Sequence, residues 1–453
     1  MRALSLGSEP YHFNMILSCD IYMTVNQHFT ATISGYISGT DDEIVEVAMR
    51  NSNLIIYAEE NEKSKSLFRG RICHLKIQEE GGLKILTVKA ESNTAVLDEE
   101  IHTRSFQDIG YTYQNIAELV IKKTEKAGVI YYSGKEEQAD GLVVQYEETD
   151  WMFLKRLAGR VHTVLVPDCT NDFICFYFGI PRKKEKAVWK SKDFDIAMEY
   201  SGNYLKNRVM EYQVVSREIW ELCTPVQIQG KELLVYAVQG NLDGGEMIWQ
   251  YRLRRMEDFG FSEPWNQCIT GVSLFGKVLE SKNDMVRLEL ECEDDFKRGE
   301  GIWFPYATVY ASIDGNGWYF MSDEGVKVRL CFPDKNEGNA YVASATYLED
   351  VMGEKNNPEI KFIRTAQGKE IRLAPDYILI TNHKGMSIRL DDECGIMIRS
   401  SGNIELVSDN GVNLFSEGEI CMDSQSGVLL KQGENSFTIK EGIRARGMRV
   451  RFQ

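Results

Sequence analysis

The sequence has no long hydrophobic run and few of the residues that build catalytic or metal centres. No stretch of eighteen apolar residues occurs, so no segment is expected to span a membrane, and the first residues, MRALSLGSEPYHFN, lack the continuous apolar stretch of a signal peptide. The 10 cysteines form no CxxC pair and no Cys/His cluster with zinc spacing, and the 6 histidines fall in no catalytic motif. We therefore expect no metal, no cofactor and no catalytic residue, and free thiols in a reducing cytosol.

Basic residues are fewer than acidic residues. The 453 residues carry 52 Lys and Arg against 68 Asp and Glu, a net charge of −16. A nucleic-acid binder usually presents a basic face, so no nucleic acid is expected as a partner. With 43% hydrophobic residues, a chain of this length builds ordinary cores in about two to four domains.

Residues 1–260 predict an α+β region of two subdomains. Strand-like stretches such as FTATISGYIS and LKILTVKAES are followed by two helical patterns, and further strands come after them. The first helix is predicted over Tyr113–Lys126, with Gly128 as its stop. The second is predicted over Asp150–Arg160, with Thr149 or Asp150 as its N-cap and with apolar residues that recur at helical spacing.

Residues 261–350 predict a small barrel. Six short stretches are typical of strands separated by turns, namely VSLFGKVLES, MVRLELE, ATVYASI, GWYFM, VKVRLCF and AYVASATYL. This number suits a closed or nearly closed barrel of the OB-fold type. Residues 351–376, with EKNNP near their start, are interpreted as a linker.

An eight-residue repeat occupies residues 377–453. One apolar residue recurs in every octad, six times in succession, and a second apolar residue follows it two places later. Gly, Asn or Ser residues, which favour tight turns, stand just before these pairs. The paired positions are Ile388, Leu390, Ile396, Ile398, Ile404, Leu406, Val412, Leu414, Ile420, Met422, Val428 and Leu430.

The octads predict a needle built from several chains. One strand per octad, turning the same way each time, makes a solenoid, and a single chain this thin buries little on its inner face. Three chains wound together bring their apolar pairs onto a common axis. We therefore predict an intertwined trimeric β-helix over 377–453, with the paired positions on its axis. The alternative is an ordinary β-sandwich whose spacing is a coincidence.

The order of these regions, together with three motifs, resembles the spike proteins of contractile injection systems. These are VgrG of the type VI secretion system, phage late control D and related baseplate hub–spike proteins. The motifs are LFRGRI (67–72), RSFQDIGYTYQNIAELVI (104–121) and VQYEETDWMFLKRLAGR (144–160). The last one closely matches a signature of that family at Gln145, Tyr146, Glu148, Thr149, Asp150, Phe153, Leu154, Arg156 and Leu157.

The resemblance implies structural roles for the signature residues. Asp150 would cap a helix, Arg156 would pair with an acid, and Phe153 and Leu157 would pack. It also implies a mainly β homotrimer with a hub, a barrel that acts as a collar and a C-terminal needle. Such a trimer sits at the centre of a baseplate, pierces the target envelope and is not an enzyme.

The resemblance further implies the partners and the location of the protein. The partners are other copies of the chain, baseplate and inner-tube proteins, an effector cargo and a tip protein of the PAAR type. A target membrane is touched only on puncture. The particle is assembled in the cytoplasm and leaves the cell on firing or release.

The last residues, KEGIRARGMRVRFQ, alternate arginines with apolar residues. A prism of strands ends in open edges that invite a cap. We hypothesise that this segment is the seat of the implied tip protein, formed by Ile443, Met448, Val450 and Phe452. The simpler interpretation is that the arginines keep a β-rich end soluble.

Two other functions stay open at this point. One is a carbohydrate-binding tailspike or adhesin, although the octads offer little aromatic surface for sugars. The other is a tail-associated hydrolase, although the acidic residues show no positional signal for catalysis. The predicted linker, of about 25 residues, is also too short for a hydrolase domain.

Overall fold

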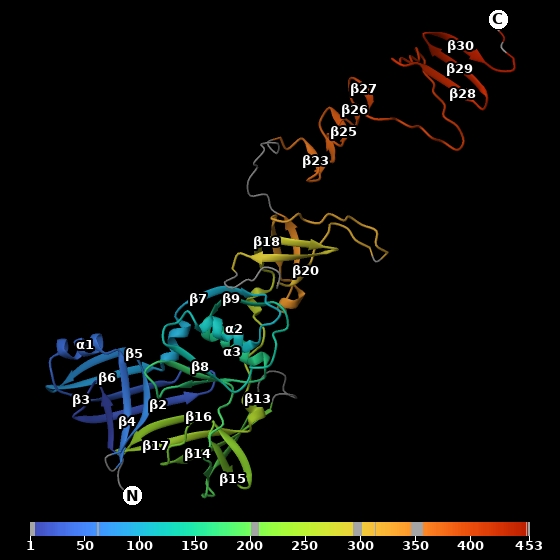
Figure 1. Cartoon of the computed structure of the whole chain (residues 1–453). Helices are drawn as coiled ribbons and strands as arrows, with labels where there is room; N and C mark the ends of the chain where they lie inside the picture. Colours follow the sequence, from blue (N-terminus) through green and yellow to red (C-terminus); the bar gives the residue numbers. More distant parts are fainter. Residues whose placement is uncertain are drawn as a thin grey trace. The chain divides into compact units, whose positions relative to one another are not determined.

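Two compact units, Met1–Tyr347 and Leu348–Gln453, make up the chain. The fold is mainly β, with several antiparallel sheets and few helices (Figure 1). No helix in the described part of the chain is long and apolar enough to cross a membrane. The structure is a computed structural model that describes residues 5–60, 63–200, 208–292, 301–312, 314–345, 357–449 and 451.

A twelve-stranded sheet dominates the first unit. Its main path runs β1-β4-β5-β6-β3-β2-β16-β17-β14-β13, and β15 pairs with β16 and with β12. The strands are β1 (Ser5–Glu9), β2 (Met15–Thr24), β3 (Thr30–Ile37), β4 (Asn53–Glu60), β5 (Lys63–Glu80), β6 (Leu83–Glu91), β12 (Ala187–Val188), β13 (Asp195–Tyr200), β14 (Arg208–Ser216), β15 (Pro225–Ile228), β16 (Lys231–Asp243) and β17 (Glu246–Arg254).

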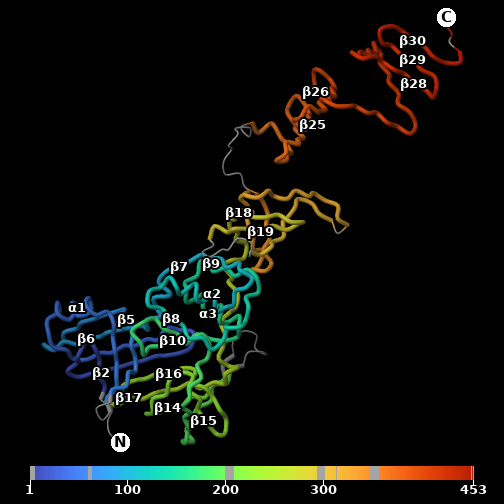
Figure 2. Tube along the Cα trace, in the orientation of Figure 1, coloured from blue at the N-terminus to red at the C-terminus, as the bar shows by residue number. Residues whose placement is uncertain are grey.

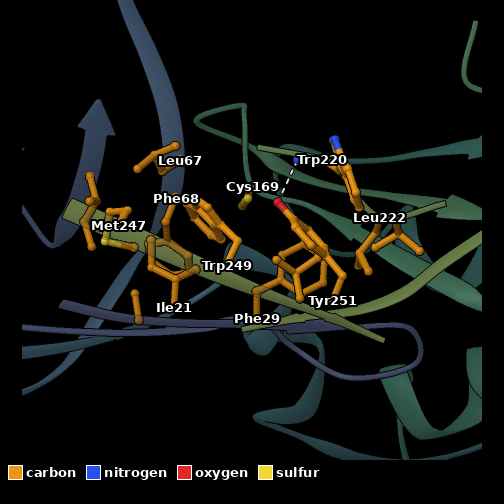
Figure 3. Packing of buried hydrophobic residues seen from close by; sticks show 14 of the residues in the cluster. Ile21, Phe29, Leu67, Phe68, Cys169, Trp220, Leu222, Met247, Trp249 and Tyr251 are labelled. Atoms are coloured by element: carbon orange, nitrogen blue, oxygen red, sulfur yellow. Dashed lines mark hydrogen bonds between the residues drawn. The ribbon is translucent and has the colours of Figure 1, made fainter. Parts of the chain in front are cut away.

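Segments far apart in the sequence share this sheet. β2 pairs antiparallel with β16, so Thr24 lies opposite Ala237 and Asp20 opposite Asn241. The inward residues of both halves form one core, in which the side chains of Trp249 and Tyr251 lie close to Cys169 (Figure 3). The early strands β1–β6 and the later strands β12–β17 are therefore joined by backbone hydrogen bonds as well as by a common core.

Helix α1 (Asp41–Arg50) was not predicted from the sequence. It begins with a capping box, in which the Thr40 side chain accepts a hydrogen bond from the backbone of Glu43 and the Glu43 carboxylate accepts one from the backbone of Thr40. Only Ile44 is buried along the helix. The apolar stripe is therefore short, which explains why periodicity did not reveal it.

The second layer of the first unit holds α2 (Tyr113–Ile121) and α3 (Asp150–Arg160). The prediction of α3 is confirmed, and the predicted end of α2 is wrong. After Ile121 the chain turns over residues 122–126, where Lys126 has a positive φ of 56°, and Ala127 and Gly128 then belong to a strand that pairs with Ile174 and Cys175. Two small sheets accompany the helices, formed by β7 (Ile101–Phe106) with β9 (Val143–Thr149), and by β8 (Ala127–Tyr131), β10 (Leu165–Asp168) and β11 (Ile174–Phe178).

A five-stranded sheet follows in the chain, in the order β20-β19-β18-β21-β22. Its two end strands approach each other, since Tyr306 forms a bridge with Val342 and the N–H of Ala307 donates to the carbonyl of Val342 at 2.7 Å. Its core includes Leu142 and Val144, which come from the preceding region. The strands are β18 (Ser273–Lys282), β19 (Met285–Leu290), β20 (Trp303–Pro305), β21 (Lys327–Cys331) and β22 (Tyr341–Ala345).

Two of the six strands predicted for this region are wrong. ATVYASI and GWYFM form no regular strand and instead make an arm, described over residues 307–312 and 314–321, with one isolated β-bridge between Ala311 and Gly317. Strand β20 was missed, because Trp303–Pro305 is only three residues long. Alternating apolar residues predicted strands in the arm, yet those side chains have no buried face to join within the first unit.

The second unit contains two separate antiparallel sheets. Residues 351–376, interpreted as a linker, include the first two strands, so regular structure begins at Lys361 rather than at 377; residues 351–356 lie outside the described part of the chain. The first sheet is β23 (Lys361–Arg364), β24 (Glu370–Leu373), β25 (Tyr377–Thr381), β26 (Ser387–Asp391) and β27 (Gly395–Arg399), and the second is β28 (Val428–Gln432), β29 (Asn435–Lys440) and β30 (Gly442–Arg446).

Between the two sheets, residues 400–427 form no regular strand. They consist of extended stretches separated by bends at 401–402, 409–410, 417–418 and 425–426, so a bend occurs every eight residues. The trace of the second unit shows the extended run between β26 and β28 (Figure 2). The predicted spacing of the turns is confirmed, whereas one chain alone forms no β-helix in the described part of this unit.

Candidate assembly sites

One face of the sheet β23–β27 carries two continuous apolar rows. Direct cross-strand pairing aligns the first row, which is Ile363, Ile371, Ile380, Ile388 and Ile398. The same pairing aligns the second row, which is Leu373, Ile378, Leu390 and Ile396. Cross-strand partners lie on one face of a sheet, so these side chains form one apolar surface.

None of the described residues covers this apolar surface in the single chain. Its side chains are between 39% and 74% exposed. Four of the predicted axis residues, Ile388, Leu390, Ile396 and Ile398, lie in it and are brought together. The other members stand before the first octad and were not predicted, although the alternation of apolar and polar residues in KFIRTAQGKEIRL could have revealed them.

The apolar side chains of the octads between the two sheets, residues 400–427, are also exposed. No strand of the described residues pairs with them, and their apolar positions are between 51% and 71% exposed. Exposed apolar rows of this length mark an interaction surface in a soluble protein. The residues are Ile404, Leu406, Val412, Leu414, Ile420 and Met422.

The last predicted pair lies in the second sheet of this unit. Val428 is opposite Ile439, and Leu430 is opposite Phe437. Ile439 in turn is opposite Ile443 on β30. The apolar surface of the octads therefore continues to the last strand.

The predicted tip seat is only partly described. Ile443 lies on β30 and is 73% exposed, and Met448 is fully exposed. Val450 and Phe452 lie outside the described residues.

The signature motif forms a buried network of charges in the first unit. The Asp150 carboxylate accepts a hydrogen bond from Arg104 at 2.8 Å and one from the Gln145 side chain at 2.9 Å. The N-cap of α3 is Thr149, whose side chain accepts a hydrogen bond from the N–H of Met152. Of the two N-cap candidates, Thr149 is therefore confirmed, and the implied capping role of Asp150 is wrong, because Asp150 is the first helical residue and its carboxylate bonds to Arg104.

Arg156 pairs with an acid, as the resemblance implied. Its Nη2 lies 2.8 Å from a carboxylate oxygen of Glu148, and its Nη1 lies 3.0 Å from Glu337. Glu337 also pairs with Arg160 at 2.6 Å. Phe153 and Leu157 are fully buried, as expected.

Glu337 joins α3 to the five-stranded sheet. It begins a short 3-10 helix, Glu337–Asn339, on the connection from β21 to β22, and it is 1% exposed. Glu337 was not predicted as a partner of Arg156, because the two residues lie 181 positions apart in the sequence. A buried arginine with one local acid does indicate that a further acid is needed, but not which one.

One cluster in the first unit has the residue types of a catalytic triad. His28 lies 2.8 Å from Asp98 through Nε2 and 2.8 Å from Thr94 through Nδ1. Burial raises the pKa of Asp98, but hydrogen bonds from His28 and Thr149 outweigh it and hold that pKa below its usual value. Thr94 is fully buried, so a substrate cannot reach its hydroxyl. The cluster links the turn between β2 and β3 to the 3-10 helix Asn93–Asp98.

The comparisons with known proteins identify the fold. No family model matches the sequence, and no curated protein sequence matches it. Among solved structures, the E. coli protein c3393 aligns over 76% of this chain and all of its own, with a TM-score of 0.53 and 14% identity. That protein is described as a component of the type VI secretion system with structural similarity to the phage T4 tail proteins gp27 and gp5.

VgrG structures align over more of the chain. The half-lidded Francisella PdpA–VgrG complex covers 88% of this chain and 88% of its own, with a TM-score of 0.59 and 8% identity. The lidless form covers 88% and 98%, with a TM-score of 0.56. The resemblance to the VgrG and baseplate hub family is confirmed at the level of the fold, which this chain shares with them.

Proposed function

We propose that this chain is a structural hub–spike protein of a contractile injection system or phage-tail-like particle. It acts as a homotrimer at the centre of the baseplate and pierces the target envelope mechanically. The fold it shares with VgrG and the gp27/gp5-like protein supports this role. Residues 1–260 form the hub, 261–350 the collar, 351–376 the connection and 377–453 the needle.

The observation that supports the needle is the uncovered apolar surface of the octads. Extended stretches with bends every eight residues leave apolar side chains exposed and backbone groups without strand partners in one chain. Unpaired edges and apolar surface both gain free energy when further strands cover them. Three copies provide that cover for one another and place the paired positions on a shared axis.

The five-stranded sheet is proposed to be an OB-type barrel. The support is the approach of its end strands at Tyr306 and Val342, which would close the sheet on itself. The barrel then serves as a collar between hub and needle. No residue in this proposal acts as a nucleophile, acid or base.

Light scattering on the purified protein tests the trimer. The expected mass is about three times 51.8 kDa. Negative-stain images of the same sample should show a broad hub with one thin needle. A folded monomer or dimer would overturn the proposal.

The proposed partners are baseplate and inner-tube proteins, an effector cargo and a tip protein. The shared fold supports baseplate and inner-tube proteins as partners. VgrG itself is described in a complex with PdpA. For the tip protein, β30 ends the second sheet with the exposed residues Ile443 and Met448 near it. Deletion of 443–453 should leave the trimer intact and abolish capture of a PAAR-type tip protein in a pull-down; undiminished capture would place the seat elsewhere.

A further inference from the structure

The arm of the five-stranded sheet, residues 307–321, displays aromatic side chains to solvent. Trp318 is 51% exposed, Tyr319 70% and Phe320 54%, and Tyr310 on the opposite limb is 55% exposed. Figure 1 shows a segment projecting from the sheet that holds β18 and β20. Aromatic residues bury large areas when they are covered, so a cluster of them in water marks a contact surface.

Hydrogen bonds hold the two limbs of the arm although its side chains are exposed. The N–H of Trp318 donates to the carbonyl of Tyr310 at 2.9 Å, and the Thr308 hydroxyl donates to the carbonyl of Trp318 at 2.6 Å. The Tyr319 hydroxyl donates to the carbonyl of Asn283 at 2.7 Å, which fixes the arm to the turn between β18 and β19. An arm held in this way loses little conformational freedom on binding, which favours association.

A second surface on the same sheet suits the arm. On the outer face of β18 and β21, Phe275 lies opposite Arg329 and Lys277 opposite Lys327. The Lys327 ammonium lies 4.6 Å, and the Arg329 guanidinium 5.0 Å, from the centre of the Phe275 ring. We call these four residues the basic patch. Lys277 and Arg329 are exposed, whereas Lys327 is half-buried and also pairs with Glu291. Exposed cations attract aromatic faces, and Asp314 near the tip of the arm adds an opposite charge.

A threefold assembly requires contacts of this kind. A threefold ring closes only through two different surfaces, whereas identical surfaces pair as a twofold dimer. The arm and the basic patch are two different surfaces on one sheet. Each copy therefore offers one arm and one patch to its neighbours.

The chain length keeps the sheets of three copies close to one another. Fifteen residues, 346–360, join β22 to β23, and a fully extended chain of that length spans at most about 55 Å. Three copies joined through one needle would therefore hold their sheets at an effective concentration on the order of 1 mM. Even a weak contact between arm and patch is occupied under this condition.

We propose that each arm packs its aromatic side chains on the basic patch of the next copy of the chain. The contact locks the three collars into a ring. This inference rests on the trimer of the proposed function, and it adds the contact that fixes the collar. It predicts that Trp318 is shielded from water in the assembled protein.

Quenching of tryptophan fluorescence by acrylamide tests the proposal on the full-length protein. The signal of Trp318 is the difference between the wild type and Trp318→Phe, with the mass of each sample measured by light scattering. The expected quenching constant for Trp318 in the trimer is at least threefold below that of free N-acetyltryptophanamide. Arg329→Glu should raise it toward the free value, while Arg255→Glu, a charge reversal at another exposed site, should leave it unchanged.

The outcomes separate the two proposals. A trimer in which Trp318 is quenched like the free indole overturns the arm contact and leaves the hub–spike proposal standing. A monomer overturns both. If Arg329→Glu leaves Trp318 as shielded as in the wild type, the arm does not bind the basic patch and the proposal is wrong. If Trp318 is exposed in the trimer and soluble peptidoglycan fragments shield it, the arm binds sugar rather than a second copy, and the proposal is also wrong.

Discussion

Glu337 is buried between Arg156 and Arg160, and its charge stabilises the contact between α3 and the five-stranded sheet. Glu337→Gln leaves two buried guanidinium groups without their shared carboxylate. Breaking a buried pair of this kind costs about 3–5 kcal/mol. Guanidinium unfolding followed by tryptophan fluorescence should show a loss of this size.

The matched control is Glu263→Gln, which removes a surface pair with Lys335 at 3.3 Å. Exposed pairs contribute about 0–1 kcal/mol, so its unfolding curve should stay close to that of the wild type. Equal losses for the two variants would mean that the buried network has no special energetic role.

Glu370 makes the stability of the second unit depend on pH. Burial raises its pKa, but hydrogen bonds from Arg364, His383 and Arg372 outweigh burial and lower the pKa from 4.5 to about 2. The folded state therefore favours the ionised carboxylate. This stabilisation is complete above about pH 4.5 and is lost as the pH falls from there toward 2.

Hydrogen exchange of peptides covering β24 and β25 measures this effect. Glu370→Gln should exchange faster than the wild type at pH 7, and the difference should vanish near pH 2. Glu359→Gln, at an exposed position in the same unit, should behave like the wild type at every pH. A difference between Glu370→Gln and the wild type that persists at pH 2 would assign the effect to packing instead of charge.

At the scale of elements, each octad is proposed to gain its strand partners only from other copies of the chain. Ile404→Asp and Leu406→Asp each place three carboxylates on the proposed trimer axis. An unpaired buried charge costs about 3 kcal/mol or more, so the needle should fail to assemble while the hub stays folded. Circular dichroism melts should lose their most stable β transition.

Asn413→Asp provides the matched control for the octads. Asn413 stands between Val412 and Leu414 and therefore points to the opposite side of the extended stretch. It adds the same charge without placing it on the axis, and the melt should be unchanged. If Ile404→Asp also melts like the wild type, these side chains point outward.

At the scale of the whole molecule, the octads set the length of the needle. Each octad should advance the assembly by about one strand spacing, ~4.8 Å. Six octads then give roughly 30 Å, and the flanking strands add more. Cryo-EM of the trimer measures this length directly, and a globular sandwich at residues 388–430 would contradict it.

The sequence by itself determined the features that depend on local order and repetition. Helix α3 is predicted from its apolar stripe, and the spacing of the bends in the second unit is predicted from Gly, Asn and Ser at every octad. The apolar positions Ile388, Leu390, Ile396 and Ile398 share a face because a strand alternates its side chains regardless of partners. These features need no contact between distant residues.

Only the tertiary structure decided the features that depend on such contacts. The pairing of β2 with β16, the acid that joins Arg156 and Arg160, and the early end of α2 each involve residues many positions apart. Likewise, the alternation in ATVYASI predicted a strand, but a strand also needs a neighbour to pair with, and among the described residues the arm forms an isolated bridge instead of a strand ladder. The sequence pattern specifies which faces of a helix or strand are apolar, and packing decides which of these faces meet. Many pairs of elements would satisfy the same pattern, but only one arrangement satisfies every element at once.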